Sequence, residues 1–157
     1  MMLLSGIAVG QPKTTKEQLV GTWSLVSVTA EGSDGSKSDR FGVTPKGIMI
    51  FTYDGHFSLF QSRPEVPKIA ANTPAKATAE EATAVMEASI AYYGTYSVNE
   101  AEKTISVKIE GSTFANLVGQ EQKRIITSLT PDELKFNNPR TPAGVTLLTV
   151  WKRAPPL

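Results

Sequence analysis

One short segment of the sequence holds side chains that could transfer protons. Tyr53, Asp54 and His56 follow one another closely, and His56 is the only histidine in the chain. An imidazole titrates near neutral pH, and a neighbouring carboxylate can orient it as a general base. Asp54-Gly55 between alternating apolar residues is also a preferred sequence for a tight hairpin turn. We favour this structural interpretation, with His56 beside the turn and partly exposed.

The sequence offers few candidate residues for other kinds of catalysis. The chain has no cysteine, which excludes disulfides, thiol catalysis and thiolate metal ligands. A single histidine excludes a multi-histidine metal site, and haem would depend on His56 alone as its axial ligand. The sequence also lacks a nucleophile elbow and a paired-carboxylate motif. It therefore predicts no metal, no cofactor and no catalytic residue.

A larger set of residues has the character of a binding pocket. Small-molecule pockets are lined mainly by apolar and aromatic side chains, with a few polar groups that orient the ligand. The residues of this kind are Phe51, Ser58, Phe60, Tyr93, Tyr96, Asn116, Gln122, Arg124 and Phe136. Alternatively, these side chains simply fill the interior as core.

The elements that would position these residues are mostly strands. Three segments between 92 and 129 alternate apolar and polar residues, which is typical of half-buried antiparallel strands. Segment 111–119 between the last two is bracketed by glycines and too apolar for a plain linker, so it is a candidate functional loop. In residues 48–62 a two-residue turn would pair Phe51 with Ser58. Both faces of that hairpin are apolar, and the pattern leaves open which one faces inward.

The rest of the chain completes a barrel. We expect a short helix at 15–19 and further strands at 21–29, 134–136 and 145–152. A capping box at Thr78 and Glu81 begins a helix that runs to about Ala91 and could lie on the barrel as a lid. About eight strands with short connections close most economically as an antiparallel barrel, whose interior is nearly filled or holds one small ligand.

Several segments together resemble one family. Gly21-Thr22-Trp23 is similar to the G-x-W signature of lipocalins and the wider calycin group. Further matches are Tyr-Asp-Gly at 53–55, the helix start at 77–82, Tyr-Gly-Thr-Tyr at 93–96, and Glu-Gly-Ser through Gly-x-Glu-Gln-x-Arg at 110–124. From about Leu19 to Arg153 the chain resembles the lipocalin-like domain family.

This resemblance implies a calycin-type barrel and favours a central pocket over a filled core. It implies no activity, because most members of the family have none assigned. It also implies a structural plug, in which an arginine of a late strand stacks on Trp23 at the closed end, with Arg124 as first candidate and Arg153 as second. Relatives tend to carry a His-His pair where this chain has Val107 and Lys108, so chemistry based on those imidazoles does not carry over.

The sequence thus predicts an all-β protein, an eight-stranded antiparallel lipocalin-like barrel with one inserted α-helix. We expect it to bind a small hydrophobic or amphipathic molecule without performing chemistry. One alternative is an isomerase, cyclase or hydrolase that uses the same cavity. Another is a structural barrel that pairs through an apolar outer face, as in a homodimer. Sixteen Lys and Arg against 15 Asp and Glu provide no electrostatic footprint for nucleic acid, and no apolar run is long enough for a membrane span.

Residues 15–157 are predicted to form the barrel domain, and residues 1–14 precede it. The first ten are apolar, and Ala8-Val9-Gly10 has the small-x-small form of a signal-peptidase site, but a basic n-region is missing. The segment is either the remnant of a signal peptide, which implies a periplasmic or secreted protein, or an N-terminal arm of a cytoplasmic one. The sequence leaves both open.

Overall fold

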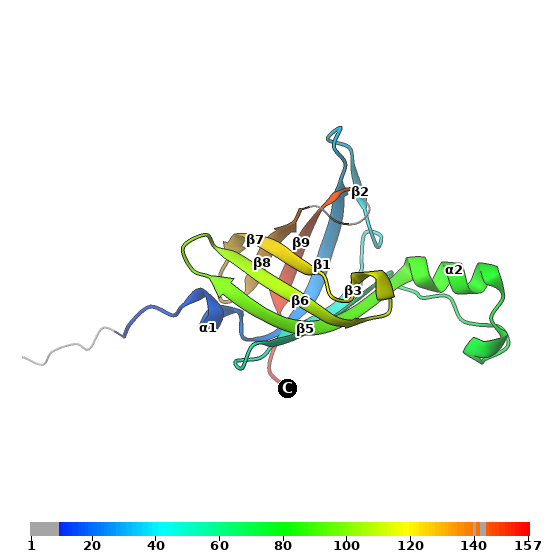
Figure 1. Cartoon of the computed structure of the whole chain (residues 1–157), viewed down its shortest axis with the longest axis horizontal. Helices are drawn as coiled ribbons and strands as arrows, with labels where there is room; N and C mark the ends of the chain where they lie inside the picture. Colours follow the sequence, from blue (N-terminus) through cyan, green and yellow to red (C-terminus); the bar gives the residue numbers. More distant parts are fainter. Residues whose placement is uncertain (1–9, 140, 142–143) are drawn as a thin grey trace, which may run out of the picture.

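The computed structural model describes residues 10–139, 141 and 144–157, and within them nine strands form one antiparallel sheet. Their bounds are β1 (Gly21–Glu31), β2 (Lys37–Asp39), β3 (Lys46–Phe51), β4 (His56–Ser62), β5 (Ser89–Asn99), β6 (Thr104–Ser112), β7 (Glu121–Leu129), β8 (Glu133–Asn138) and β9 (Thr146–Arg153). Because β1 pairs with both β3 and β9, the strands other than β2 close into an eight-stranded barrel (Figure 1). The predicted fold is confirmed, with β2 as a short addition beside β1.

Helix α1 (Thr15–Leu19) lies at one end of the barrel, which we call the closed end (Figure 1). The Thr14 hydroxyl and the Glu17 carboxylate form a capping box at its start. The Glu100 carboxylate, in the turn between β5 and β6, accepts hydrogen bonds from the backbone N–H groups of Thr15 and Lys16. Glu100 thereby satisfies helix donors that would otherwise lack a partner. A hydrogen bond from the Thr15 side chain first, and then these two backbone bonds, hold the pKa of Glu100 below its ordinary value. The short helix is thus joined to the barrel at its first turn.

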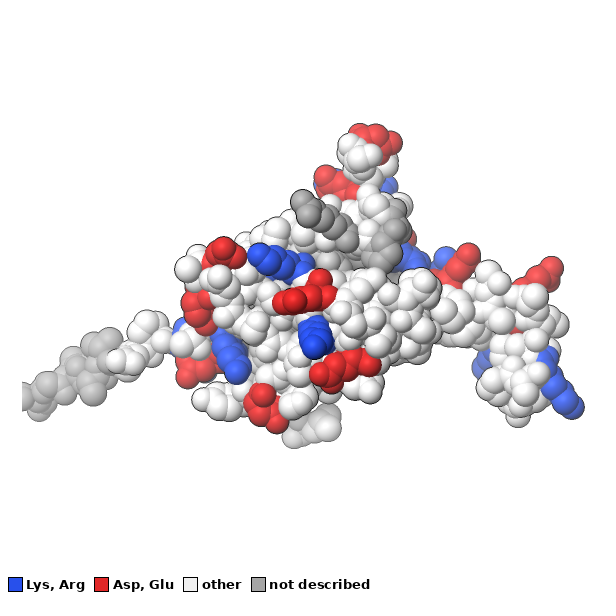
Figure 2. Space-filling model, viewed as in Figure 1, with Lys and Arg blue, Asp and Glu red and all other residues white. Residues whose placement is uncertain are grey.

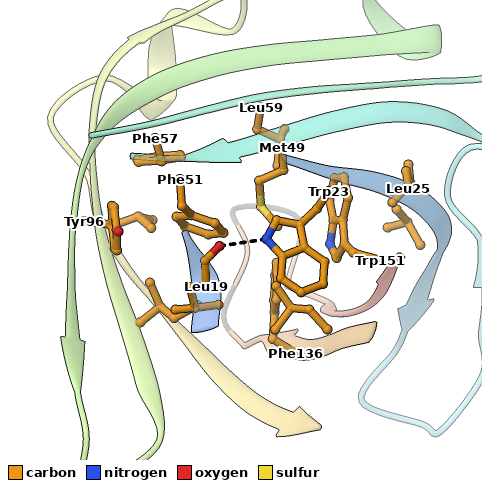
Figure 3. Packing of buried hydrophobic residues seen from close by; sticks show 14 of the residues in the cluster. Leu19, Trp23, Leu25, Met49, Phe51, Phe57, Leu59, Tyr96, Phe136 and Trp151 are labelled. Carbon is orange, nitrogen blue, oxygen red and sulfur yellow. Dashed lines mark hydrogen bonds between the residues drawn. The ribbon is translucent and has the colours of Figure 1, made fainter. Parts of the chain in front are cut away.

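Inward side chains of successive strands form one apolar core (Figure 3). The Phe51 ring packs edge-on against Tyr96, with 4.9 Å between ring centroids, and the Tyr96 hydroxyl donates to the Thr52 carbonyl. Trp23 and Trp151 are fully buried. Because strand side chains alternate between faces, this interior follows from the period-two pattern of the sequence.

The hairpin of β3 and β4 corrects the predicted register. Phe51 pairs with Phe57 rather than with Ser58, because the loop is one residue longer than the expected Asp-Gly turn. The Gly55 N–H bonds to the Thr52 carbonyl, and Gly55 has a φ of 96°. This is a three-residue loop, in which a type I turn ends in a left-handed residue that glycine adopts without strain. Relative to the predicted register, this shift of one residue exchanges the side chains of β4 that point inward with those that point outward.

Helix α2 (Ala79–Ala88) follows the 3-10 turn η1 (Pro74–Lys76) in an arm that projects beyond the end of the barrel away from α1 (Figure 1). The predicted capping box of Thr78 and Glu81 is confirmed. The helix ends before the predicted Ala91, because β5 already begins at Ser89. The prediction that α2 packs on the barrel as a lid is wrong, because Met86 on its apolar stripe is 48% exposed. An alanine-rich stripe offers little apolar area to bury, which accounts for the difference.

Gly94 of β5 lies where two strands approach closely. A Cβ at this position would be 1.8 Å from the Lys108 carbonyl oxygen, since β6 bulges here. We expect Gly94→Ala to lower the free energy of unfolding by about 2 kcal/mol, as overpacking does, in a urea titration. Gly10→Ala, whose Cβ meets no atom within 4 Å, is the control. Equal stability of both variants would contradict the close approach.

Candidate ligand-binding site

A cavity of about 600 Å³ opens at the end of the barrel opposite α1. It is reached between the far ends of β1, β4, β5, β8 and β9 and the loop that carries the 3-10 turn η2 (Ala115–Leu117). Its wall consists of Ala30, Arg40, Phe41, Gln61, Ile90, Tyr92, Phe114, Leu117, Gln122, Asn138, Thr141, Val145 and Leu147. Apolar side chains form most of this wall, and the polar ones are few.

The apolar loop after β6 supplies part of the mouth. Leu117 is 6% exposed, and together with Phe114 it lines the cavity. Gly119 has a φ of 84°, and its N–H donates to the Ile109 carbonyl at 2.8 Å, which turns the chain back into β7. Phe114 and Leu117 thus bring this loop to the cavity. Its function stays a prediction.

The floor of the cavity is polar and centres on Arg124 of β7. Its guanidinium donates to the Tyr92 hydroxyl at 2.8 Å and to the Gln122 side-chain oxygen at 3.1 Å. It also stacks on Phe136, with 5.6 Å between Cζ and the ring centroid. Asn138 donates to the same Gln122 oxygen at 3.5 Å. Tyr92, Gln122 and Asn138 face the cavity, with the arginine directly behind them.

The structure brings only part of the predicted pocket together. Gln122 lines the cavity, with Arg124 bonded to it and Phe136 stacked on Arg124. Phe51 and Tyr96 are core residues near the closed end. The side chains that do not turn inward are Ser58, Phe60, Tyr93 and Asn116. Residues that the prediction missed include Gln61, Tyr92 and Leu117.

The outward side chains belong to an apolar face of the barrel. Phe60 is 40% exposed and pairs with Ile48, while Tyr93 is 56% exposed and pairs with Ser58. This face has the apolar character expected of a surface that pairs two copies of the chain. The homodimer itself stays a prediction.

The arginine over Trp23 is Arg153, the second candidate, and the assignment of Arg124 to the plug is wrong. The Arg153 guanidinium carbon lies 4.1 Å from the centre of the Trp23 ring. The reason is register, because Trp23 of β1 pairs directly with Arg153 at the end of β9. The Trp23 indole donates to the Leu19 carbonyl at 2.8 Å (Figure 3). Trp23 thus joins α1 to the barrel at the closed end.

The Asp54 and His56 pair lies at the closed end, outside the barrel. Asp54 accepts hydrogen bonds from the Thr52 hydroxyl and, at 3.1 Å, from His56 Nδ1. The Thr52 hydroxyl first, and then His56, hold the pKa of Asp54 below its ordinary value. Both side chains are more than half exposed. This geometry organises a turn and leaves the pair remote from the cavity.

Charges on the surface are mixed. Figure 2 shows Lys and Arg side chains interspersed with Asp and Glu over the face viewed. Within the described ranges, no group of three or more His, Asp or Glu residues is placed to hold a metal ion. Of the helices in that same part of the chain, none has the length and apolar character to cross a membrane.

Comparison with solved structures finds other barrels. A redesigned β-barrel matches at 19% identity and a TM-score of 0.47, over 90% of this chain and 96% of its own. A redesigned β-barrel bound to DFHBI matches at 18% identity and 0.45, over 90% and 100%. Bovine odorant-binding protein in complex with a selenium-containing odorant matches at 12% identity and 0.46, over 96% and 80%.

Comparison by sequence gives a family but no individual relative. No curated protein matches the chain. The model of the lipocalin-like domain, in contrast, matches residues 20–153, from the start of β1 to the end of β9. This chain therefore belongs to the lipocalin-like domain family.

Proposed function

We propose that this protein binds one small, mainly apolar molecule in the open end of its barrel and performs no chemistry on it. The observation that carries the proposal is the cavity of about 600 Å³, within the volume range of small-molecule pockets. Burial of apolar ligand surface there contributes about 25 cal/mol per Å². The few polar wall residues suffice to orient a ligand.

The position of the Asp54 and His56 pair supports the part of the proposal that excludes chemistry. A general base must come within hydrogen-bond reach of the proton that it removes. This pair is exposed outside the closed end, whereas the cavity opens at the other end. A ligand in the cavity would not meet it.

Two neighbouring leucines of β9 allow a matched test. Leu147 lines the cavity, and Leu148 points to the opposite face of the strand. N-phenyl-1-naphthylamine, a neutral dye that becomes fluorescent when buried, is the probe. We expect Leu147→Trp, which fills part of the cavity, to weaken dye binding about tenfold or more. Leu148→Trp should leave the affinity near that of the wild type.

Absence of dye binding by the wild type, or equal binding by both variants, would refute the cavity as the binding site. Mass spectrometry of solvent extracts from natively purified protein addresses the ligand itself. Recovery of a small apolar or amphipathic compound from the wild type, and its loss from Leu147→Trp, is the expected result.

A further inference from the structure

The cavity floor holds a positive charge that no acidic side chain neutralises. Arg124 is 3% exposed. All 15 Asp and Glu residues lie in the described part of the chain, none of them is buried, and none forms an ion pair with Arg124. The two bonds that the guanidinium makes go to neutral oxygens, of Tyr92 and Gln122. A buried charge without a counter-charge is unfavourable, so a bound anion that pairs with Arg124 would stabilise this arrangement.

The cavity wall also carries an excess of positive charge. No acidic side chain lines it, and Arg40 at the mouth adds a second cation. Arg40 lies over the Phe41 ring at 4.6 Å and donates to the Glu87 carbonyl, so it too is paired with neutral groups. In a recess with low-dielectric walls, charges of one sign reinforce one another. The interior therefore has a positive potential.

Hydrogen-bond donors face the place where an anion would lie. The Tyr92 hydroxyl accepts from Arg124, and among the residues described no acceptor takes its own proton. A hydroxyl that accepts a charged hydrogen bond becomes a stronger donor. Gln61 is 6% exposed and lines the cavity, and its side-chain amide makes no hydrogen bond to another described residue. Two donors on the cavity lining are thus left for a ligand, with the cation behind one of them.

We propose that the ligand of this cavity is an amphiphile with a single carboxylate head. The carboxylate lies at the polar floor, where it accepts from Tyr92 and Gln61 and neutralises Arg124. The apolar body lies along Ile90, Leu117 and Leu147. This inference rests on the proposed function and specifies the chemical class of the ligand.

Competition between two molecules that differ only in their head tests the proposal. Decanoate and decan-1-ol each displace N-phenyl-1-naphthylamine at about pH 8, where a carboxylic acid is ionised. We expect the wild type to prefer decanoate. In Arg124→Gln the ratio of the two affinities should fall about tenfold or more, the loss of one charge-assisted interaction. The control is Lys123→Gln, which removes the same charge from an exposed neighbour on β7 and should keep the preference.

Dye binding separates this inference from the function on which it rests. If the dye binds and decanoate has no advantage over decan-1-ol, or keeps its advantage in Arg124→Gln, the carboxylate proposal is overturned while the binding function stands. If the wild type does not bind the dye, the binding function fails, and the carboxylate proposal fails with it. Should Arg124→Gln not fold, Tyr92→Phe removes only the hydroxyl at the floor, and a reduced preference for decanoate is again the expected result.

Discussion

Replacement of Trp23 by alanine will lower the free energy of unfolding by about 3–5 kcal/mol. The side chain is fully buried between α1 and the core, so its loss removes a large packed volume that the barrel cannot refill. The indole hydrogen bond to the Leu19 carbonyl and the stacking of Arg153 are lost with it. Urea unfolding followed by circular dichroism measures the effect. A domain of this size has a total stability of about 5–15 kcal/mol, so the variant loses a large fraction of it.

Trp23→Phe serves as the control. It keeps most of the apolar volume and loses only the indole N–H and part of the stacking surface, so a cost of about 1–2 kcal/mol is expected. If the alanine variant were as stable as its parent, the closed end would not depend on Trp23.

Arg153→Met will have the second-largest effect, a loss of about 3 kcal/mol. The guanidinium donates to three backbone carbonyls, those of Gln18, Val20 and Pro131. These oxygens come from the end of α1 with the residue that follows it, and from the turn between β7 and β8. The planar fork of one arginine therefore joins two segments while its face covers Trp23. Urea unfolding of the variant against the wild type gives the value.

Arg153→Lys distinguishes the fork from the charge. One ammonium cannot reach three carbonyls and stack on an indole, so lysine should recover only a minor part of the loss. Lys152→Met, which removes the same charge from an exposed neighbouring position, should change stability little. If Arg153→Lys were as stable as the wild type, the positive charge alone would account for the stabilisation of the closed end.

Local signals in the sequence sufficed to predict the barrel strands and the two α-helices. Alternation located the eight barrel strands, and a Thr-x-x-Glu pattern located the start of α2. The hairpin register failed because Asp54-Gly55 fits a two-residue or a three-residue loop equally well, and only the packed barrel selects between them. That one-residue difference placed Phe60 outside and Leu59 inside.

The candidate site was harder to predict because its residues meet across the barrel. Alternation from Tyr96 could have identified Tyr92 as inward, since residues four apart on a strand share a face, whereas Tyr93 lies on the opposite face. Nothing local could assign Arg153 rather than Arg124 to Trp23, because the choice depends on how β1 pairs with β9. The cation at the cavity floor also depends on long-range contacts, because Arg124 of β7 meets Tyr92 of β5 and Phe136 of β8.

The bonds from Arg153 to the residues around α1 have a consequence for attachment. The chain enters the barrel through α1 and leaves it after β9, and these two points are within hydrogen-bond distance of each other, opposite the cavity mouth (Figure 1). A carrier joined next to either point, whether a tag, a neighbouring domain or a solid support, would sit behind the closed end. The mouth would then face away from the carrier and stay accessible from solution.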